Sequence, residues 1–336
     1  MPVRTLARRA ICLCLIAPLT WAGAVLGADR SDFVRPLYIP FSEDAPYSPL
    51  RATLGKMLFF DPRVSGAGNI SCATCHNPSF GWEVPTVGPI GATNETLARQ
   101  APTILNSAWG RHYFWDGRAA TLEEQAAGPI TATVEMAGDL TEIVERLSQI
   151  ETYADGFAAA YPDAGMTQDT ILNALATFER TVVTNWAPFD RWVDGDENAI
   201  SEEAKRGFEV FVGDGRCADC HAGWNFTDDM FHDIGLDTTD VGRAAIAPDE
   251  DRSQHAFKTP GLRNIFYRAP YMHNGGLANI EAVIAHYVSG GEARASLSPL
   301  MQPLDLTDRQ IADLVAFLAS LTADEEAVAS PLLPTE

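Results

Sequence analysis

Two five-residue stretches decide the fold of this chain: Cys72-Ala73-Thr74-Cys75-His76 and Cys217-Ala218-Asp219-Cys220-His221. They hold every cysteine beyond the first 28 residues. A C-x-x-C-H run is the attachment motif of a c-type haem, because two thiols at this spacing reach the vinyl groups while the histidine turns back to the iron. A pair of disulfides, a redox C-x-x-C site or a four-cysteine zinc site needs no histidine after each pair. The sequence therefore predicts two covalently bound c-type haems.

The motifs lie in similar surroundings 145 residues apart, which indicates an internal duplication. A short amphipathic segment precedes each motif, at residues 54–60 and 206–211, and a longer helix closes each half. Thr167 and Thr307 stand where the N-caps of the closing helices are expected. The apolar faces of these helices are Ile171, Leu172, Leu175, Phe178 and Val182 in the first half and Ile311, Leu314, Val315, Leu318 and Leu321 in the second.

This order of elements is the layout of a cytochrome c domain. We therefore expect an all-α protein, mainly helical with long loops, built from two tandem cytochrome c-like domains with one covalent c-type haem each. The N-terminal domain is expected at residues 29–185 and the C-terminal domain at 196–336. Between them, residues 184–196 contain Asn, Pro, Asp and Gly residues that interrupt the helical pattern.

The composition limits the partners of the protein. The chain has 336 residues, 46% of them hydrophobic, which is enough for one large or two ordinary domains. It carries 45 acidic and 24 basic residues, a formal charge of −21. So negative a charge argues against nucleic acid or an anionic membrane surface as a partner and is compatible with a basic protein partner.

The first 28 residues read as an export signal. Arg4, Arg8 and Arg9 precede an apolar run over residues 10–26, and small residues follow. No later stretch reaches the roughly 18 apolar residues that a membrane-spanning helix needs. We therefore expect a periplasmic protein whose signal peptide, residues 1–28, is cleaved and which has no transmembrane segment.

Several further segments resemble the bacterial di-haem cytochrome c peroxidase superfamily, and within it the MauG-like (MbnH-like) branch, over nearly all of the chain. These segments are Leu54-Gly55-Lys56-Met57-Leu58-Phe59-Phe60-Asp61-Pro62, Ala101-Pro102-Thr103-Ile104-Leu105-Asn106, Phe114-Trp115-Asp116-Gly117-Arg118-Ala119, Val134-Glu135-Met136 and Pro270-Tyr271-Met272-His273-Asn274-Gly275. The resemblance implies that the N-terminal haem, held by His76, meets hydrogen peroxide. The C-terminal haem, held by His221, then handles electrons.

The loop after the first motif departs from the usual di-haem peroxidases, which carry a distal histidine there. No histidine occurs between His76 and His112, and residues 88–94 offer no replacement ligand. The first haem is therefore expected to be five-coordinate, as in MauG, with Met136 or Met166 as the alternative ligands.

The resemblance assigns roles to four further residues near the first haem. Glu135 matches a general acid/base that moves protons during cleavage of the peroxide bond. Gln125 matches a polar residue that binds the oxidant, and Pro129 matches one that shapes the pocket. Trp115 matches the residue placed between the two haems as an electron relay. Without the resemblance, each of these residues has an ordinary surface or core interpretation.

The residue opposite His221 distinguishes the branches of the superfamily. The family position falls on Tyr287, where the electron-accepting peroxidases have Met and MauG has Tyr. From the residues alone, His286 and Met301 are alternative iron ligands. His273 is expected to contact a haem propionate. A calcium ion lies between the domains in this superfamily, and the matching residues here are Gln100, Arg268 and Pro270.

Together these features predict an oxidoreductase that uses hydrogen peroxide to form a high-valent two-haem state. That state would oxidise Trp or Tyr residues of a partner protein docked at the surface, by long-range electron transfer. The alternative is a di-haem cytochrome c peroxidase that reduces peroxide to water with electrons from a cytochrome or copper protein. A third interpretation is a di-haem cytochrome that only transfers electrons. It requires a protein ligand on both sides of each iron, so that neither iron can bind peroxide.

Overall fold

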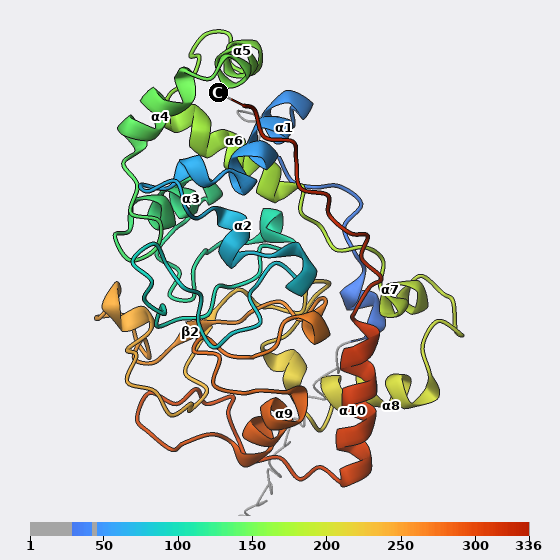
Figure 1. Ribbon diagram of the computed structural model, residues 1–336. Helices are drawn as coiled ribbons and strands as arrows, with labels where there is room; N and C mark the ends of the chain where they lie inside the picture. The colour runs from blue at the N-terminus through green and yellow to red at the C-terminus, as the bar shows by residue number, and fades with distance from the viewer. Residues whose placement is uncertain (1–28, 42–45, 336) are drawn as a thin grey trace, which may run out of the picture.

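The computed structural model describes residues 29–41 and 46–335 and is mainly helical, as the sequence predicts (Figure 1). The export signal predicted for residues 1–28 lies outside the described residues. The α-helices are α1 (Pro49–Phe60), α2 (Cys72–Cys75), α3 (Leu122–Thr131), α4 (Leu140–Ser148), α5 (Glu151–Ala160), α6 (Gln168–Arg180), α7 (Pro188–Val193), α8 (Glu202–Val212), α9 (Ile280–Ser289) and α10 (Asp308–Ser320).

Short 3₁₀ helices and one small sheet lie in the long loops. The 3₁₀ helices are η1 (Arg30–Phe33), η2 (Pro62–Val64), η3 (Pro78–Phe80), η4 (Ser107–Trp109), η5 (Cys217–Asp219), η6 (Arg243–Ala245) and η7 (Ile265–Tyr267). The strands β1 (Phe231–His232) and β2 (Phe257–Lys258) pair antiparallel.

The first half is built on the crossing of α1 and α6. A Cβ atom at Gly55 would overlap the carbonyl oxygen of Ala174, so glycine permits this close approach. The side chain of Thr167 accepts a hydrogen bond from the backbone N–H of Thr170, which confirms the predicted N-cap of α6. The core around this crossing includes Leu58, Phe59, Tyr153, Phe157, Ile171 and Leu175, each fully buried.

The second half repeats this arrangement with α8 and α10. Gly207 lies against the carbonyl oxygen of Asp313, as Gly55 lies against that of Ala174. Thr307 caps α10 by accepting from the N–H of Gln310, again as predicted. The core here is rich in aromatic side chains, including Phe189, Phe208, Phe211, Phe226 and Phe317. The internal duplication is therefore a repeated helix crossing.

Three segments connect the halves in a way that the sequence did not predict. The stretch 184–196 contains helix α7, because Phe189 and Trp192 are buried in the second core and hold it in place. Phe33, from the N-terminal segment, packs in the same core. Conversely, the carbonyl of Pro334 accepts a hydrogen bond from Arg63, so the C-terminal tail returns along the first half (Figure 1).

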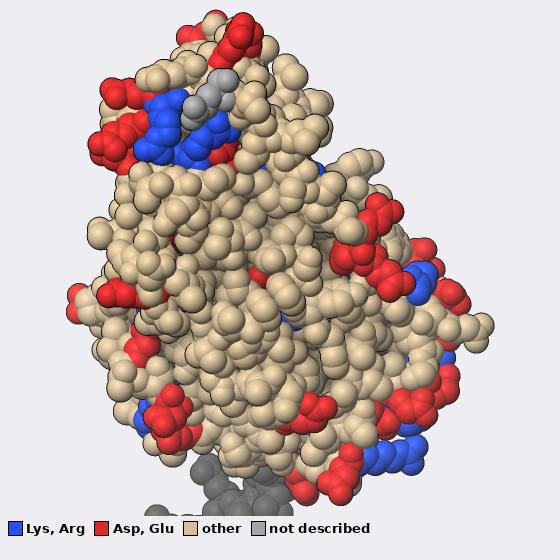
Figure 2. Space-filling model, viewed as in Figure 1, with Lys and Arg blue, Asp and Glu red and all other residues tan. Residues whose placement is uncertain are grey.

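On the face shown in Figure 2, acidic side chains outnumber basic ones and gather on the side where α7 and α8 lie. This distribution agrees with the excess of acidic residues in the sequence. Within residues 29–41 and 46–335, no helix has both the length and the apolar character needed to span a bilayer.

Candidate haem sites

Each C-x-x-C-H motif opens into a cavity of its own. The first cavity, of about 710 Å³, is lined by Cys72, Cys75 and His76. The second cavity, of about 180 Å³, is lined by Cys217, Cys220 and His221. All four thiols are free rather than joined in disulfides, so they remain available to form thioether bonds to haem.

Backbone carbonyls orient both motif histidines. The Nδ1 atom of His76 lies 3.2 Å from the carbonyl oxygen of Trp82, and that of His221 lies 2.9 Å from the carbonyl oxygen of Phe226. Trp82 and Phe226 both have positive φ, 62° and 56°, which residues other than glycine seldom adopt. A hydrogen bond at Nδ1 leaves Nε2 for the metal, which is the usual arrangement of an iron-binding histidine. The residues present therefore fit two c-type haems.

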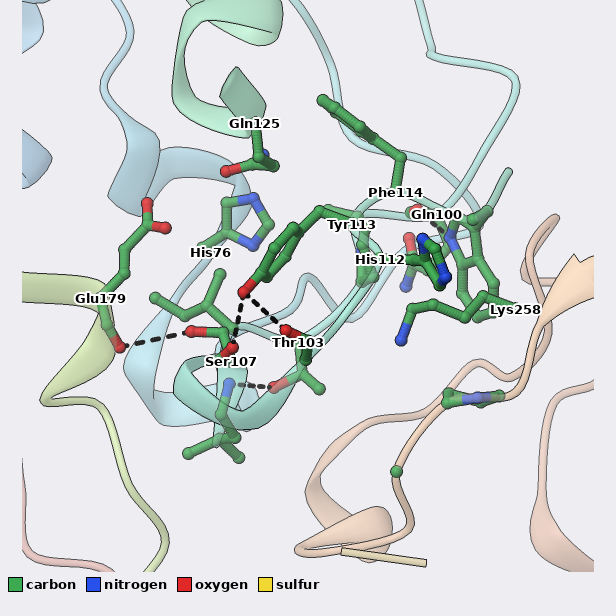
Figure 3. A pocket seen from close by; sticks show the side chains of 18 of the residues that line it. His76, Gln100, Thr103, Ser107, His112, Tyr113, Phe114, Gln125, Glu179 and Lys258 are labelled. Atoms are coloured by element: carbon green, nitrogen blue, oxygen red, sulfur yellow. Dashed lines mark hydrogen bonds between the residues drawn. The ribbon is translucent and has the colours of Figure 1, made fainter. Parts of the chain in front are cut away.

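Helix α3 and the turn after it bring the polar residues of the first cavity together. Gln125 and Pro129 lie on α3, and Glu135 follows the helix; all three line the cavity with His76. Figure 3 shows Gln125 and His76 extending into the same space from separate segments. Burial raises the pKa of Glu135 above its usual value, and the nearby Arg118 cation opposes this rise.

The loop after the first motif packs against the backbone next to Glu135. The N–H of Ala92 donates to the carbonyl of Glu135 at 2.7 Å, and a Cβ atom at Gly91 would overlap the carbonyl oxygen of Val134. This loop therefore supports Glu135 and contributes Pro89 to the cavity lining.

The two methionines considered as alternative ligands lie in different places. Met136 is buried and lines the first cavity. Met166 packs against the core of the first half and is not among the residues that line the cavity. Of the two, only Met136 therefore has access to an iron held by His76.

The sequence interpretation missed Glu179, a buried acid that lines the first cavity. Burial raises the pKa of Glu179 to about 8, and its Oε2 atom has no hydrogen-bond partner among the residues that the structure describes. The available signal was its spacing: Glu179 lies four residues after Leu175, on the apolar face of α6. Figure 3 shows this carboxyl group at the edge of the cavity.

Trp115 lies between the two cavities and lines both of them. Its Nε1–H donates to the carbonyl of Gln100 at 2.8 Å, and its own carbonyl accepts from the N–H of Lys258 at 2.8 Å. These two bonds fix the indole in place. The relay role that the resemblance implies for Trp115 stays a prediction.

Three side chains were considered as the second ligand of the iron held by His221, and two of them line the second cavity. Tyr287, on α9, and Met301 both line it. The Nε2 atom of His286 instead lies 2.9 Å from the carbonyl oxygen of Ile234, and His286 lines a different depression. Burial raises the pKa of Tyr287. The geometry thus leaves Tyr287 and Met301 as ligand candidates.

His273 also lines the second cavity and is almost fully buried. Its ring stacks on Phe257 with centroids 3.6 Å apart, and burial lowers its pKa to about 4. The neutral imidazole lies 3.4 Å from the hydroxyl of Thr238 through Nε2. His273 can therefore offer a hydrogen bond near a haem edge without carrying charge.

The predicted calcium residues occupy the region between the cavities. Gln100 and Arg268 line both cavities, and Pro270 lines the second. The Nε2 of Gln100 donates to the carbonyl of Val84 at 2.8 Å, whereas its buried Oε1 has no hydrogen-bond partner within residues 29–41 and 46–335. An unpartnered amide oxygen fits a hard cation such as Ca²⁺.

Comparison with known families gives two matches that follow each other along the chain. A family model for di-haem cytochrome c peroxidase matches residues 49–198, and a model for cytochrome c matches residues 204–322. Each match includes one C-x-x-C-H motif.

Characterised relatives match over most of their length. The methylamine utilization protein MauG of Methylorubrum extorquens is 47% identical over 92% of this chain and 88% of its own. MauG of Methylophilus methylotrophus is 46% identical, over 95% and 96%. The cytochrome c551 peroxidase of Nitrosomonas europaea is 36% identical, over 88% and 86%.

A solved structure shows the same fold. The crystal structure of a MauG-like protein associated with microbial copper homeostasis superposes with a TM-score of 0.80 and 31% sequence identity. The match covers 86% of this chain and 94% of that protein. The finer placement in an MbnH-like branch stays a prediction.

Proposed function

Because this chain belongs to the di-haem cytochrome c peroxidase family that includes MauG, we propose that it uses hydrogen peroxide to oxidise Trp or Tyr side chains of a separate protein. It is a haem-dependent oxidoreductase with two c-type haems, as its family and relatives are. One observation carries the proposal: Glu135 and Gln125 share the first cavity with His76, while the loop that follows the motif supplies no histidine.

Cys72 and Cys75 would attach the first haem, and His76 would bind its iron. When bound, this haem supplies an iron centre that takes oxidising equivalents from peroxide. Cys217, Cys220 and His221 would hold the second haem in the same way. The protein's own contribution is to orient the two histidines, to handle protons and to conduct electrons.

Glu135 is the proposed proton carrier. Its carboxylate accepts a proton from one oxygen of peroxide and returns it to the departing oxygen, so that water leaves. The raised pKa of Glu135 makes its carboxylate a stronger base than an exposed one, which favours uptake of the proton. Gln125 holds the peroxide through its side-chain amide, and Pro129 shapes the wall of the cavity.

Trp115 is the proposed electron relay between the two haems. Its indole lines both cavities and is fixed by the hydrogen bond to Gln100, so it shortens the gap without moving.

Tyr287 is the proposed distal ligand of the second haem. Since burial raises its pKa, this phenol ionises only beside a strong positive charge such as that of ferric iron. An anionic oxygen donor stabilises oxidised iron, whereas Met would favour its reduction. His273 would contact a propionate of the same haem.

We further propose that Gln100 Oε1 and the carbonyls of Arg268 and Pro270 hold a calcium ion between the halves. The support is the unpartnered oxygen of Gln100. We also propose a cleaved export signal at residues 1–28 and a periplasmic location. We also propose the domain limits 29–185 and 196–336, each domain built around one motif, although Phe33, Phe189 and Trp192 pack in the core of the second half.

Adding peroxide to the resting ferric protein, with no reductant present, tests the proposed function. We expect an immediate change in the haem absorption spectrum, because no side chain has to leave the iron of the first haem before peroxide binds. A strict requirement for prior reduction would contradict the proposal and would favour the alternative, a cytochrome c peroxidase that draws electrons from a donor protein. The partner is then sought as a protein whose Trp or Tyr is modified in the presence of peroxide.

A further inference from the structure

Three tryptophans outside the machinery described above lead from the first cavity to the surface. Trp109, on η4, and Trp224, shortly after the second motif, both line the first cavity. Their rings meet edge to face with centroids 4.8 Å apart. The two indoles come from different halves of the molecule and are in contact where the halves meet.

Arg35 connects Trp224 to a third indole, that of Trp186. The guanidinium carbon of Arg35 lies 5.6 Å from the ring centroid of Trp224 and 5.9 Å from that of Trp186. The centroids of these two rings are therefore no farther apart than the sum of these distances. Trp186 is 50% exposed, so the line of indoles ends at the surface.

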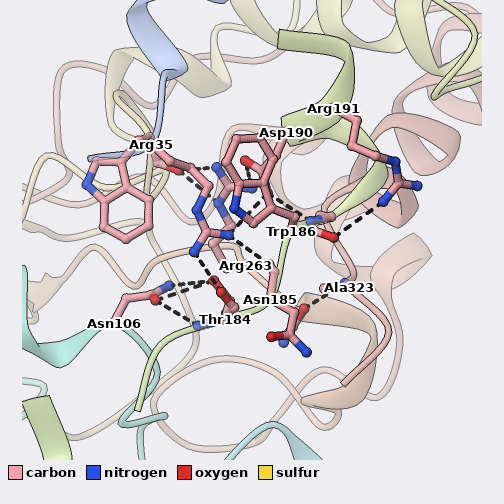
Figure 4. A network of polar contacts seen from close by, with 12 residues as sticks. Arg35, Asn106, Thr184, Asn185, Trp186, Asp190, Arg191, Arg263 and Ala323 are labelled. Atoms are coloured by element: carbon pink, nitrogen blue, oxygen red, sulfur yellow. Dashed lines mark hydrogen bonds and ion pairs between the residues drawn. The ribbon is translucent and has the colours of Figure 1, made fainter. Parts of the chain in front are cut away.

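A polar network holds this arrangement in place (Figure 4). Arg35 donates to the carbonyl of Thr184 at 2.6 Å and to that of Asn185 at 2.7 Å, next to Trp186 in the chain. The buried carboxylate of Asp190 lies 3.3 Å from Arg35 and 2.7 Å from Arg263. These ion pairs and hydrogen bonds thus fix Arg35 and the backbone next to Trp186.

We propose that Trp186, Trp224 and Trp109 form a path along which electrons pass one at a time from the protein surface into the first cavity. The inference rests on the proposed function, because the path needs oxidising equivalents in that cavity. It differs from the role of Trp115, which joins the two cavities and does not reach the surface along this line. Trp186 is then the point at which a side chain of the partner protein is oxidised.

Electron transfer along this path balances with peroxide as the oxidant and the partner side chains as the reductant. One peroxide takes two electrons and two protons and gives two waters. Each electron leaves a partner Trp or Tyr and moves from Trp186 to Trp224, then to Trp109 and into the first cavity. No atom moves along the path. A cation over an indole face stabilises the neutral ring relative to the oxidised, positively charged one. Arg35 therefore makes the indoles of the path harder to oxidise, so that only strong oxidants use it. The carboxylate of Asp190 partly offsets the charge of Arg35.

The test uses the haem-loaded protein and peroxide with no partner present, so that the path oxidises its own outermost residue. Oxygen addition at Trp186 is measured by peptide mass spectrometry in wild type, Trp224→Phe, Trp109→Phe and Trp192→Phe. Phe keeps an aromatic ring at position 224 but is far harder to oxidise. Trp192 is a matched control because it is a buried indole on α7 that lines neither cavity.

We expect Trp186 to be oxidised in wild type and in Trp192→Phe, and this oxidation to be lost in Trp224→Phe and in Trp109→Phe. Because Trp109 and Trp224 line the first cavity, oxidation of Trp186 is expressed relative to the absorption change of the haems in each protein, and Trp192→Phe should match wild type in both measurements. Equal oxidation of Trp186 in Trp224→Phe overturns the path, because attack from solvent would explain it. An unmodified Trp186 in a wild-type protein that responds to peroxide also overturns the path but leaves the proposed function standing. No response to peroxide in wild type overturns the proposed function, and the path with it.

Discussion

The two halves of the molecule share a scaffold and differ in the cavity that it surrounds. In both, a glycine lets the first helix cross the closing helix, and a backbone carbonyl fixes Nδ1 of the motif histidine. The first cavity has a volume of about 710 Å³ and contains Gln125 and Glu135. The second has about 180 Å³ and contains Tyr287. The scaffold thus holds a cofactor in either half, and a few side chains in each cavity decide its chemistry.

Glu135→Gln should have the largest effect on this contrast, because it removes the proposed proton carrier of the first cavity. We expect the peroxide reaction to slow by about 10²–10⁴-fold, the usual contribution of a general acid/base. Stopped-flow absorption measures the rate. Glu142→Gln, an exposed acid on α4, is the control and should react as wild type does. An unchanged rate in Glu135→Gln would show that another group moves the proton.

Tyr287→Phe should remove the distinguishing residue of the second cavity. We expect the low-spin signal of the second haem to disappear from the electron paramagnetic resonance spectrum, since Phe offers the iron no donor atom. Met301→Leu is the matched variant in the same cavity and should leave that signal as it is. If instead Met301→Leu changes the signal and Tyr287→Phe does not, Met301 is the ligand.

Gly55→Ala and Gly207→Ala test whether the two helix crossings are equivalent. Each added methyl group would overlap a backbone carbonyl, and we expect either variant to lose about 1–3 kcal/mol of unfolding free energy. Denaturant unfolding of the haem-loaded protein measures the loss. The control is Gly156→Ala on α5, whose Cβ would meet only a movable Leu54 side chain and should cost less. A loss confined to one half would show that the crossings are not equivalent.

Arg118→Gln should have the smallest effect, a shift in pH dependence. Glu135 accepts a proton only as the carboxylate, so the rate of the peroxide reaction falls as the pH drops through its raised pKa. The Arg118 cation holds that pKa down, and its removal should move the acid limb of the pH–rate profile to higher pH. Arg216→Gln, an arginine in the second half, should leave the limb in place. A shift to lower pH in Arg118→Gln would contradict the assigned sign.

Much of the fold was predictable because it depends on local patterns. The two motifs, the closing helices and their caps at Thr167 and Thr307 are all visible in the sequence, and the structure bears them out. Helix α7 was not predicted, because Pro188 and Asp190 read as a linker. Phe189 and Trp192 stabilise this helix through contacts with a core formed by distant segments.

The candidate sites depended on the resemblance more than on spacing. Glu135 is one acid among 45 Asp and Glu residues, and no pattern in the sequence separates it from the others. The contact between Trp109 and Trp224 was missed because the two residues meet only in the folded chain. Glu179 was missed although its spacing places it on the apolar face of α6. Burial and distance, rather than residue type, single them out.

The central claim is that the iron held by His76 has a free coordination position in the resting protein, whereas the iron held by His221 has none. Electron paramagnetic resonance of the resting ferric protein distinguishes the two irons. We expect one high-spin and one low-spin haem signal. Two low-spin signals would contradict it, because a side chain of this chain would then occupy the position that peroxide needs.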